Sequence, residues 1–237
     1  MRLAYDLHIH SALSACSDKD MTPNNIVNMS LIKELDIIAV TDHNSAENLE
    51  AVVKCAQGKN ILVVPGMEVE TMEEIHVVCL FPGIDEAKKM QEIVYNNLPP
   101  LKNRDDIFGR QIIFDENDDE IGSIDRFLLT AVGMPIKEVY KTVLNLNGVM
   151  IPAHIDRSSY SILSNLGGIP PDLGFKYLEV SKGAVLENLK KQYPDVFDYK
   201  FIMSSDAHSL ENISERESFI EVDEKSIECV ISKLRNG

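Results

Sequence analysis

The stretch LAYDLHIHS (residues 3–11) joins a strand pattern to a pair of histidines. Residues 3–9 have the apolar and β-branched character of a buried strand, and His8 and His10 stand at its end. Side chains two residues apart in a strand point to the same face, so both imidazoles can chelate one metal ion. A lone strand histidine is usually a core residue, but two on one face, with Asp6 close by, favour a metal site.

Short β-branched runs alternate with helical patterns along the rest of the chain. The runs cover residues 3–9, 37–40, 61–64, 76–81, 149–151, 176–180 and 201–203. Helices are predicted from Thr22-Pro23 to Glu34, from about Ser45 to Gly58, from Pro135 to Asn147 and from Glu224 to Leu234. Seven strands with intervening helices predict an α/β fold built as a parallel barrel.

The alternation breaks between Asn96 and Gly133. This segment contains an acidic cluster at residues 115–120 and a predicted helix at residues 124–129. We interpret it as an insertion between the fourth and fifth strands of a single barrel domain that spans residues 1–237. The insertion is expected to be a solvated surface elaboration, and the alternative is a cap that contacts substrate. In a cap, two arginines would contact phosphate: Arg104 and Arg110.

The overall composition is that of a globular protein with a full-sized core, with 44% hydrophobic and 26% charged residues among 237. A net charge of −15 disfavours a broad surface for duplex nucleic acid or an anionic membrane, because such partners are attracted by clustered Lys and Arg. No signal-peptide pattern and no bilayer-spanning apolar stretch is present, so a cytoplasmic protein without a membrane partner is expected.

Four cysteines occur without a CxxC pair, as expected of reduced thiols rather than a disulfide framework. They are Cys16, Cys55, Cys79 and Cys229. All are interpreted as core residues, and for Cys16 a role at the edge of a site is the alternative.

The remaining histidines also stand close to carboxylates. Asp206 and His208 repeat the spacing of two residues after the seventh strand. Three further side chains follow the second, third and fifth strands, and the carboxyl ends of parallel barrel strands meet at one rim. These are His43, Glu68 and His154. Each alone would be a core histidine or a surface acid, but their shared position favours a metal site, whereas His76 begins its strand.

Together these motifs resemble the successive motifs of the PHP (polymerase and histidinol phosphatase) family. They are His8-Ile-His10-Ser11, Thr41-Asp-His43, Gly66-Met-Glu68, Glu74-Ile-His76, Pro152-Ala-His154 and Ser205-Asp-Ala-His208. The match covers nearly the whole chain in the family's order. The resemblance implies a distorted (β/α)7 barrel that binds two or three divalent ions of zinc, manganese or iron, and phosphoester hydrolysis in those members that are enzymes.

The resemblance also implies a set of metal ligands for a trinuclear site. His8, His10, Glu68 and Asp206 would hold one ion, and Glu68 would bridge to a second ion held by His76 and His154. The third ion would be held by Asp18, His43 and His208, with Asp20 as the competitor of Asp18. The loop that carries these two aspartates has three more residues than the family pattern.

Bound metal ions would make the site attractive to an anion. Three carboxylates contribute −3 and three dications +6, so the filled site would carry +3 in an acidic protein. Arg157, three residues after His154, can bind phosphate oxygens through its planar fork, with a surface salt bridge as the alternative. Lys182, after the sixth strand, is a weaker candidate for the same role.

The resulting hypothesis is a metal-dependent phosphoesterase that hydrolyses a phosphomonoester, or a nucleotide 5′ or 3′ phosphate, through a metal-bridging hydroxide. Asp206, His208 and Arg157 are the predicted catalytic residues. The expected partner is a small phosphorylated metabolite or nucleotide, with a short oligonucleotide as the alternative and no stable duplex binding. Competing activities are a 5′-to-3′ exonuclease, a histidinol-phosphatase-like enzyme, an amidohydrolase-type metal hydrolase and a non-enzymatic metal-binding module.

Overall fold

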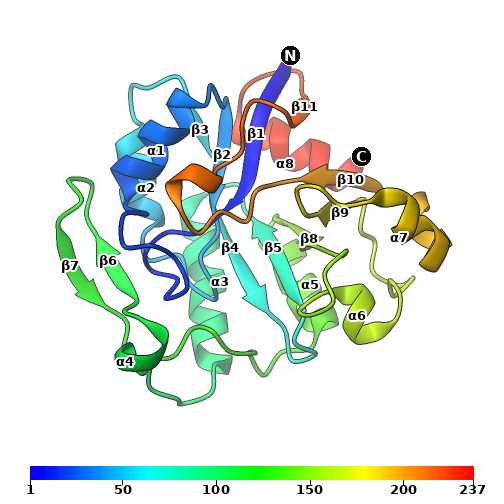
Figure 1. Cartoon of the computed structure of the whole chain (residues 1–237), viewed down its shortest axis with the longest axis horizontal. Coiled ribbons are helices and arrows are strands. Elements are labelled where there is room, and N and C mark those ends of the chain that lie inside the picture. The colour runs from blue at the N-terminus through cyan, green and yellow to red at the C-terminus, as the bar shows by residue number, and fades with distance from the viewer.

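The central strand of the first sheet is β1 (Arg2–Ile9), and it ends in the middle of the molecule (Figure 1). The computed structural model describes residues 1–237, and its first sheet has the order β11-β1-β2-β3. The neighbours of β1 are β2 (Ile37–Val40), β3 (Leu62–Val63) and β11 (Phe219–Glu221). β2 is parallel to both β1 and β3, whereas β11 is antiparallel to β1.

Two further sheets complete the central strands. β4 (Gly66–Glu70), β5 (His76–Leu80) and β8 (Val149–Pro152) form an antiparallel sheet. β9 (Tyr177–Val180) and β10 (Lys200–Met203) form a parallel pair. β5 follows β4 after only residues 71–75, which is too short for the crossover that a parallel pair requires.

The predicted α/β class is confirmed, but the predicted all-parallel arrangement is wrong and the strands form no closed barrel. All seven predicted strands are present within one or two residues, and four further strands were missed by the sequence pattern: β4, β11 and two strands of the inserted segment, at residues 112–114 and 120–123. Isolated bridges connect sheets where continuous ladders stop, between Ile9 and Ala207 and between His43 and Glu68. These irregular joins bring predicted site residues together.

The helices pack mostly on the outer face of the strands. They are α1 (Pro23–Ile32), α2 (Leu49–Ala56), α3 (Ile84–Asn97), α5 (Ile136–Asn145), α6 (Ile162–Leu166), α7 (Leu186–Gln192) and α8 (Ile227–Asn236), with 3-10 turns η1 (Pro194–Asp198) and η2 (Leu210–Asn212). The predicted start of the first helix is confirmed, because the Thr22 hydroxyl accepts from the Asn25 amide and Pro23 follows it. None of these helices combines the length and the apolar character needed to cross a bilayer.

The hydrophobic core has two parts because strand side chains alternate between faces. Ile38 and Val40 belong to a cluster of 44 buried residues that joins the strands to the helices. Ile37 and Ala39 belong to a second cluster of 18 buried residues, which α8 covers with residues such as Val230.

The four cysteines are free thiols, and Cys16 differs from the core expectation by being exposed.

The segment from Asn96 to Gly133 contains α4 (Asp105–Phe108) and a hairpin of β6 (Ile112–Phe114) and β7 (Glu120–Ser123). The helix predicted at residues 124–129 is wrong, because this stretch follows β7 as an irregular strand-like connection. The acidic cluster forms the hairpin turn, where the Asp118 carboxylate accepts from the Thr22 hydroxyl at 2.7 Å and the Asn24 amide at 2.9 Å. The Asp118 side chain therefore fastens the hairpin to the start of α1.

The assignment of the whole chain to one domain stays a prediction.

Candidate metal centre

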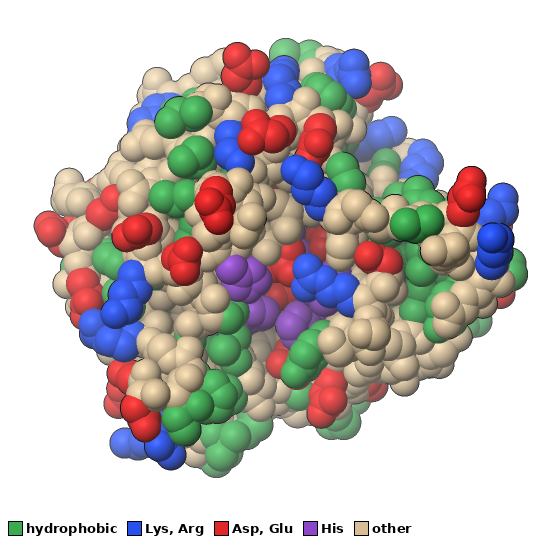
Figure 2. Space-filling view, in the orientation of Figure 1, with side chains coloured by type: hydrophobic (Ala, Val, Ile, Leu, Met, Phe, Trp, Pro, Cys, Tyr) green, Lys and Arg blue, Asp and Glu red, His purple; other side chains and the backbone are tan.

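All six histidines converge in one hollow of the surface. Neighbouring rings have centroid separations from 4.4 to 6.1 Å, although they come from the ends of β1 and β2, the start of β5 and the loops after β8 and β10. Figure 2 shows histidine side chains in this hollow beside acidic and basic groups. We call the six rings the histidine cluster: His8, His10, His43, His76, His154 and His208.

Glu68 lies at the centre of the histidine cluster. Its side chain is buried, and Oε1 lies 3.1 Å from Nδ1 of His76, 3.2 Å from Nε2 of His8 and 3.4 Å from Nε2 of His154. Oε2 lies 2.9 Å from Nδ1 of His43 and 3.5 Å from Nε2 of His10. Both oxygens lack a hydrogen-bond partner of regular geometry. Because Glu68 sits in the middle of β4, the sheet holds its carboxylate rigidly.

Asp206 closes the cluster from the loop after β10. Its Oδ1 lies 3.1 Å from Nε2 of His10 and 3.3 Å from Nε2 of His8, and its Oδ2 accepts from Arg157 at 2.7 Å. The backbone of Asp206 has φ = 51° and that of His154 has φ = 30°. Positive φ is uncommon for residues other than glycine and is often held at functional sites. The strained turns direct both side chains into the cluster.

Hydrogen bonds behind the rings determine which imidazole nitrogens face the cluster. Nδ1–H of His8 donates to Glu179 at 2.9 Å. The Ser14 hydroxyl donates to Asp42 at 2.7 Å, so it accepts from Nδ1–H of His10 at 3.0 Å. In the neutral tautomers that these bonds favour, which are the forms that bind a metal, the Nε2 atoms of both rings carry the lone pairs, and these two atoms are only 3.1 Å apart.

This donor set fits divalent metal ions. Two nitrogen lone pairs and two carboxylates repel one another in a buried site unless a cation lies between them. Three overlapping groups of ligand atoms lie within 4.8 Å of one another: His8, His10 and Glu68; His43, Glu68 and His76; His10, His43 and His208. Imidazole and carboxylate are ligands that suit zinc, manganese and iron.

The electrostatics of the cluster agree with a site for cations. Burial alone would raise the pKa of Glu68, but the nearby imidazoles of His76 and His8 outweigh it and hold that pKa well below its usual value. Burial would lower the pKa of His43, yet Glu68 raises it well above the ordinary imidazole value. The pKa of Asp206 is also lowered, since His8 and His10 outweigh the effect of its burial. Carboxylates so stabilised by positive charge are suited to hold a bound cation.

The loop between β1 and α1 places neither predicted aspartate side chain in the histidine cluster. Asp18 and Asp20 are both exposed, and neither belongs to a metal-capable group. Asp18 reaches the cluster only through its backbone amide, which donates to the His208 carbonyl at 2.8 Å. The pKa of the Cys16 thiol on the same loop is lowered to about 7, because the imidazoles of His208 and His43 outweigh its burial, and Cys16 too lies outside the metal-capable groups.

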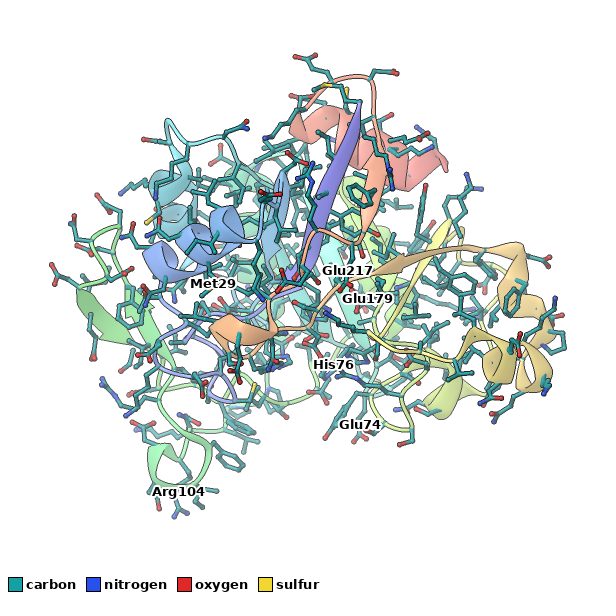
Figure 3. The ribbon with its side chains drawn as sticks, turned by 45° about the horizontal axis from the view of Figure 1, so that its top comes forward. Met29, Glu74, His76, Arg104, Glu179 and Glu217 are labelled. Atoms are coloured by element: carbon teal, nitrogen blue, oxygen red, sulfur yellow. The ribbon has the colours of Figure 1, made fainter.

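The two predicted cationic substrate contacts differ in position. Arg157 lies at the mouth of the cluster, where its guanidinium is 44% exposed and contacts Asp206 and, at 3.3 Å, the Ser181 hydroxyl. Lys182 pairs with Glu217 at 2.7 Å, so its ammonium group is turned to a surface carboxylate. Arg104 lies far out on the inserted segment in Figure 3 and pairs with Asp106.

Glu179 is a site residue that the sequence reading missed. It lies on β9, is buried, and accepts from both Nδ1–H of His8 and the backbone amide of His154 at 3.2 Å. Figure 3 shows both Glu179 and His76 in the middle part of the molecule. A charged residue inside the apolar run Tyr-Leu-Glu-Val was the available signal, because buried carboxylates need a partner.

We expect Glu179→Gln to weaken zinc binding by about 10-fold, since the neutral amide makes His8 a less basic ligand. Zinc affinity is measured by competition with a chromophoric chelator, alongside Glu187→Gln on exposed α7 as the matched control. Equal affinity in both variants would show that Glu179 does not tune the ligand.

Comparison with known proteins supports the motif assignment. The PHP domain model matches residues 6–156. Uncharacterized protein MJ0043 from Methanocaldococcus jannaschii is 33% identical over 89 residues, which are 38% of this chain and 11% of that protein. The chain therefore spans only about a tenth of the curated relative that it matches.

Several solved structures share the fold. The endonuclease Q of Pyrococcus furiosus superposes with a TM-score of 0.69 at 17% identity, covering 99% of this chain and 56% of that one. Endonuclease Q bound to a 27-mer duplex with an abasic lesion gives 0.70 at 18% identity, covering 98% and 56%. A Bifidobacterium adolescentis protein, proposed to be a metal-dependent phosphoesterase, gives 0.56 at 15% identity and covers 95% of each chain.

The family match covers more than half of the chain, and it contains the motifs of His8, His10, His43, Glu68, His76 and His154. The structural likeness then extends over nearly all of the chain, including the loop of Asp206 and His208. The resemblance seen in the motifs is thus confirmed: this chain belongs to the PHP domain family.

Proposed function

We propose that this protein is a metal-dependent phosphoesterase that hydrolyses a small phosphorylated metabolite or nucleotide at the histidine cluster. The observation that carries the proposal is Glu68, a buried carboxylate surrounded by five imidazoles without a regular hydrogen bond to either oxygen. A group so placed is suited to bridge two cations. The adjacent guanidinium of Arg157 supplies a contact for an anionic group.

Within this proposal, His8, His10, Glu68 and Asp206 hold one ion, and Glu68, His76 and His154 hold a second. Their mutual distances of 3.1 to 3.5 Å in the cluster support this division. His43 and His208 remain for a third position. Divalent ions bound here would supply Lewis acidity toward phosphoryl oxygens and acidify water for attack on phosphorus.

The protein's own groups would orient the substrate and hold the ligands. Asp206 connects two functions, because one oxygen faces His8 and His10 while the other holds the Arg157 guanidinium. That contact orients the planar guanidinium of Arg157 toward the opening of the histidine cluster, where two of its N–H groups can donate to phosphate oxygens. Glu179 and Ser14 keep His8 and His10 in the tautomers that offer Nε2 to a metal.

Substrate size follows from the charge distribution. The net charge is −15, and Arg104, Arg110 and Lys182 pair with acids outside the histidine cluster, whereas the acid that Arg157 contacts is Asp206 of the cluster itself, so Arg157 is the cation at the mouth. Extended binding of nucleic acid depends on many Lys or Arg contacts to phosphates. A substrate with one or two terminal phosphates therefore fits better than a long duplex. The nuclease alternative is tested by including oligonucleotide substrates in the experiment.

The test is a substrate panel in which the purified protein is loaded separately with Mn, Zn and Fe. Phosphate release is measured from phosphomonoesters, nucleotides and nucleoside bisphosphates, and cleavage from single-stranded oligonucleotides and an abasic-site duplex. Amides and lactones are included for the amidohydrolase alternative. We expect turnover of monoesters or nucleotides. Cleavage of the duplex alone, or of amides alone, would replace the proposal, and inertness toward every substrate with metal bound would refute it.

We expect Arg157→Lys to raise KM for the phosphate substrate by about 10-fold with a smaller change in kcat, since a charge-assisted contact contributes roughly 1.5–3 kcal/mol. Steady-state kinetics on the best substrate of the panel measures both constants. Arg110→Lys, two residues before β6 on the inserted segment, serves as the control. An unchanged KM for Arg157→Lys would remove this residue from the substrate site.

A further inference from the structure

Tyr160 is an exposed aromatic residue at the edge of the histidine cluster. Its ring packs on the ring of His76, with the centroids 4.8 Å apart and the planes tilted by 31°. The side chain is nevertheless 47% exposed, whereas the other six tyrosines are buried or half-buried. Because His76 covers one face of the Tyr160 ring, the opposite face is open to a second ring. Offset stacking at such a separation is a favourable arrangement for aromatic pairs.

The backbone holds the Tyr160 ring in this position. Tyr160 has φ = 53°, a strained conformation for a bulky residue that persists only where the surroundings enforce it. Its carbonyl accepts from the His76 amide at 3.0 Å, and the next residue, Ser161, donates from its hydroxyl to the Arg157 carbonyl at 2.8 Å. The side-chain amide of Asn165 on α6 donates to two carbonyls in the turn before β5. The ring is therefore placed before any substrate arrives.

Tyr160 and Arg157 border the histidine cluster from the same loop. Arg157 contacts Asp206, and Tyr160 packs on His76, so each of the two side chains touches a member of the metal centre. One is a cation that can accept phosphate oxygens as partners, and the other offers the face of an aromatic ring. This pairing fits a molecule that carries a phosphate close to a planar ring. A sugar phosphate would leave the Tyr160 face uncovered.

We propose that Tyr160 is a stacking platform for the base of a nucleotide whose phosphate lies at the histidine cluster beside Arg157. The proposal rests on the proposed function and narrows its substrate to nucleotides rather than phosphorylated metabolites without an aromatic ring. Stacking tolerates different bases, because every base has a π-face. The contact is also the same before and during the reaction, so it contributes to substrate affinity rather than to kcat.

Binding of two matched ligands tests this role without turnover. The ligands are the phosphonate analogues of AMP and of ribose 5-phosphate, in which CH2 replaces the ester oxygen so that neither is hydrolysed, and which differ only in the base. Isothermal titration calorimetry is performed on the full-length, zinc-loaded protein. Tyr160→Leu removes the ring but keeps a Cβ at the same backbone conformation, and Tyr160→Phe keeps the ring without the hydroxyl.

Phe108→Leu is the matched control, because Phe108 is 43% exposed and also packs on another ring, that of Phe127 at 4.6 Å. It lies on the inserted segment, so it also tests whether that segment is the cap that contacts substrate. Zinc content and circular dichroism verify that each variant keeps its metal and its fold.

We expect the parent protein to bind the AMP analogue about 10-fold more tightly than the ribose analogue. This preference should remain in Tyr160→Phe and Phe108→Leu and disappear in Tyr160→Leu, with affinity for the ribose analogue unchanged. Equal affinity of the parent for both analogues, a preference that survives in Tyr160→Leu, or an equal loss for both ligands in that variant would overturn the platform alone. If neither analogue bound the zinc-loaded parent, the proposed function would itself be overturned.

Discussion

Replacing Glu68 by Gln is expected to strip the protein of most of its metal and to lower turnover by on the order of 10³-fold. Breaking a buried charge pair by removing one partner costs about 3–5 kcal/mol, which corresponds to roughly 10²- to 4 × 10³-fold in affinity. Five imidazoles face this carboxylate, and none of its oxygens has another partner. The amide NH2 group of the Gln side chain would also point an N–H donor toward a proposed metal position.

Metal content by elemental analysis and turnover at saturating zinc or manganese measure this effect. Glu70→Gln provides a close comparison, because Glu70 lies on the same strand and approaches the cluster only at 3.8 Å from Nε2 of His76. Its loss should change metal content far less. If Glu68→Gln kept its metal and its turnover while remaining folded, the bridging role of Glu68 would be wrong.

Asp206→Asn is expected to reduce turnover by about 10³-fold or more while the melting temperature changes little. Asn tolerates the left-handed backbone at φ = 51°, so the loop after β10 can keep its shape. The substitution removes the charge that faces His8 and His10 and that orients Arg157. The loss should therefore fall on kcat and on the first metal position rather than on folding.

Turnover under saturating metal, metal content and thermal melting separate these possibilities. Asp223→Asn is the matched control, because Asp223 is exposed in the connection between β11 and α8. Normal turnover in Asp206→Asn would exclude the proposed site. A large drop in melting temperature would assign to Asp206 a structural role in place of the catalytic one.

Local spacing was enough to predict much of the candidate site. His8 and His10, or Asp206 and His208, are two residues apart, and their relation depends only on backbone geometry within one short segment. The positions of seven strands were also readable, because buried strands form short apolar and β-branched runs. The strand β4 was missed because two of its five residues are glutamates, which become buried only in the finished cluster.

Contacts between distant segments could not be predicted in this way. Glu179 lies 171 residues from His8 in the sequence, and only the arrangement of β9 beside the loop after β8 places its carboxylate behind the ring. The outward position of the Asp18 side chain depends on how the loop before α1 is fixed to His208 and to the inserted segment. Neither the amino-acid composition nor the spacing of motifs along the chain indicates such a contact.

The sequence by itself determined the family, the α/β class and the residue types of a metal centre, because these depend on local periodicity and on motifs a few residues long. Only the tertiary structure decided that β5 runs antiparallel to its neighbours, that Glu68 lies at the centre, and that the side chains of Asp18 and Asp20 face solvent. The physical reason is that burial and pairing are properties of residues brought together from distant positions, and they exist only once the chain has folded.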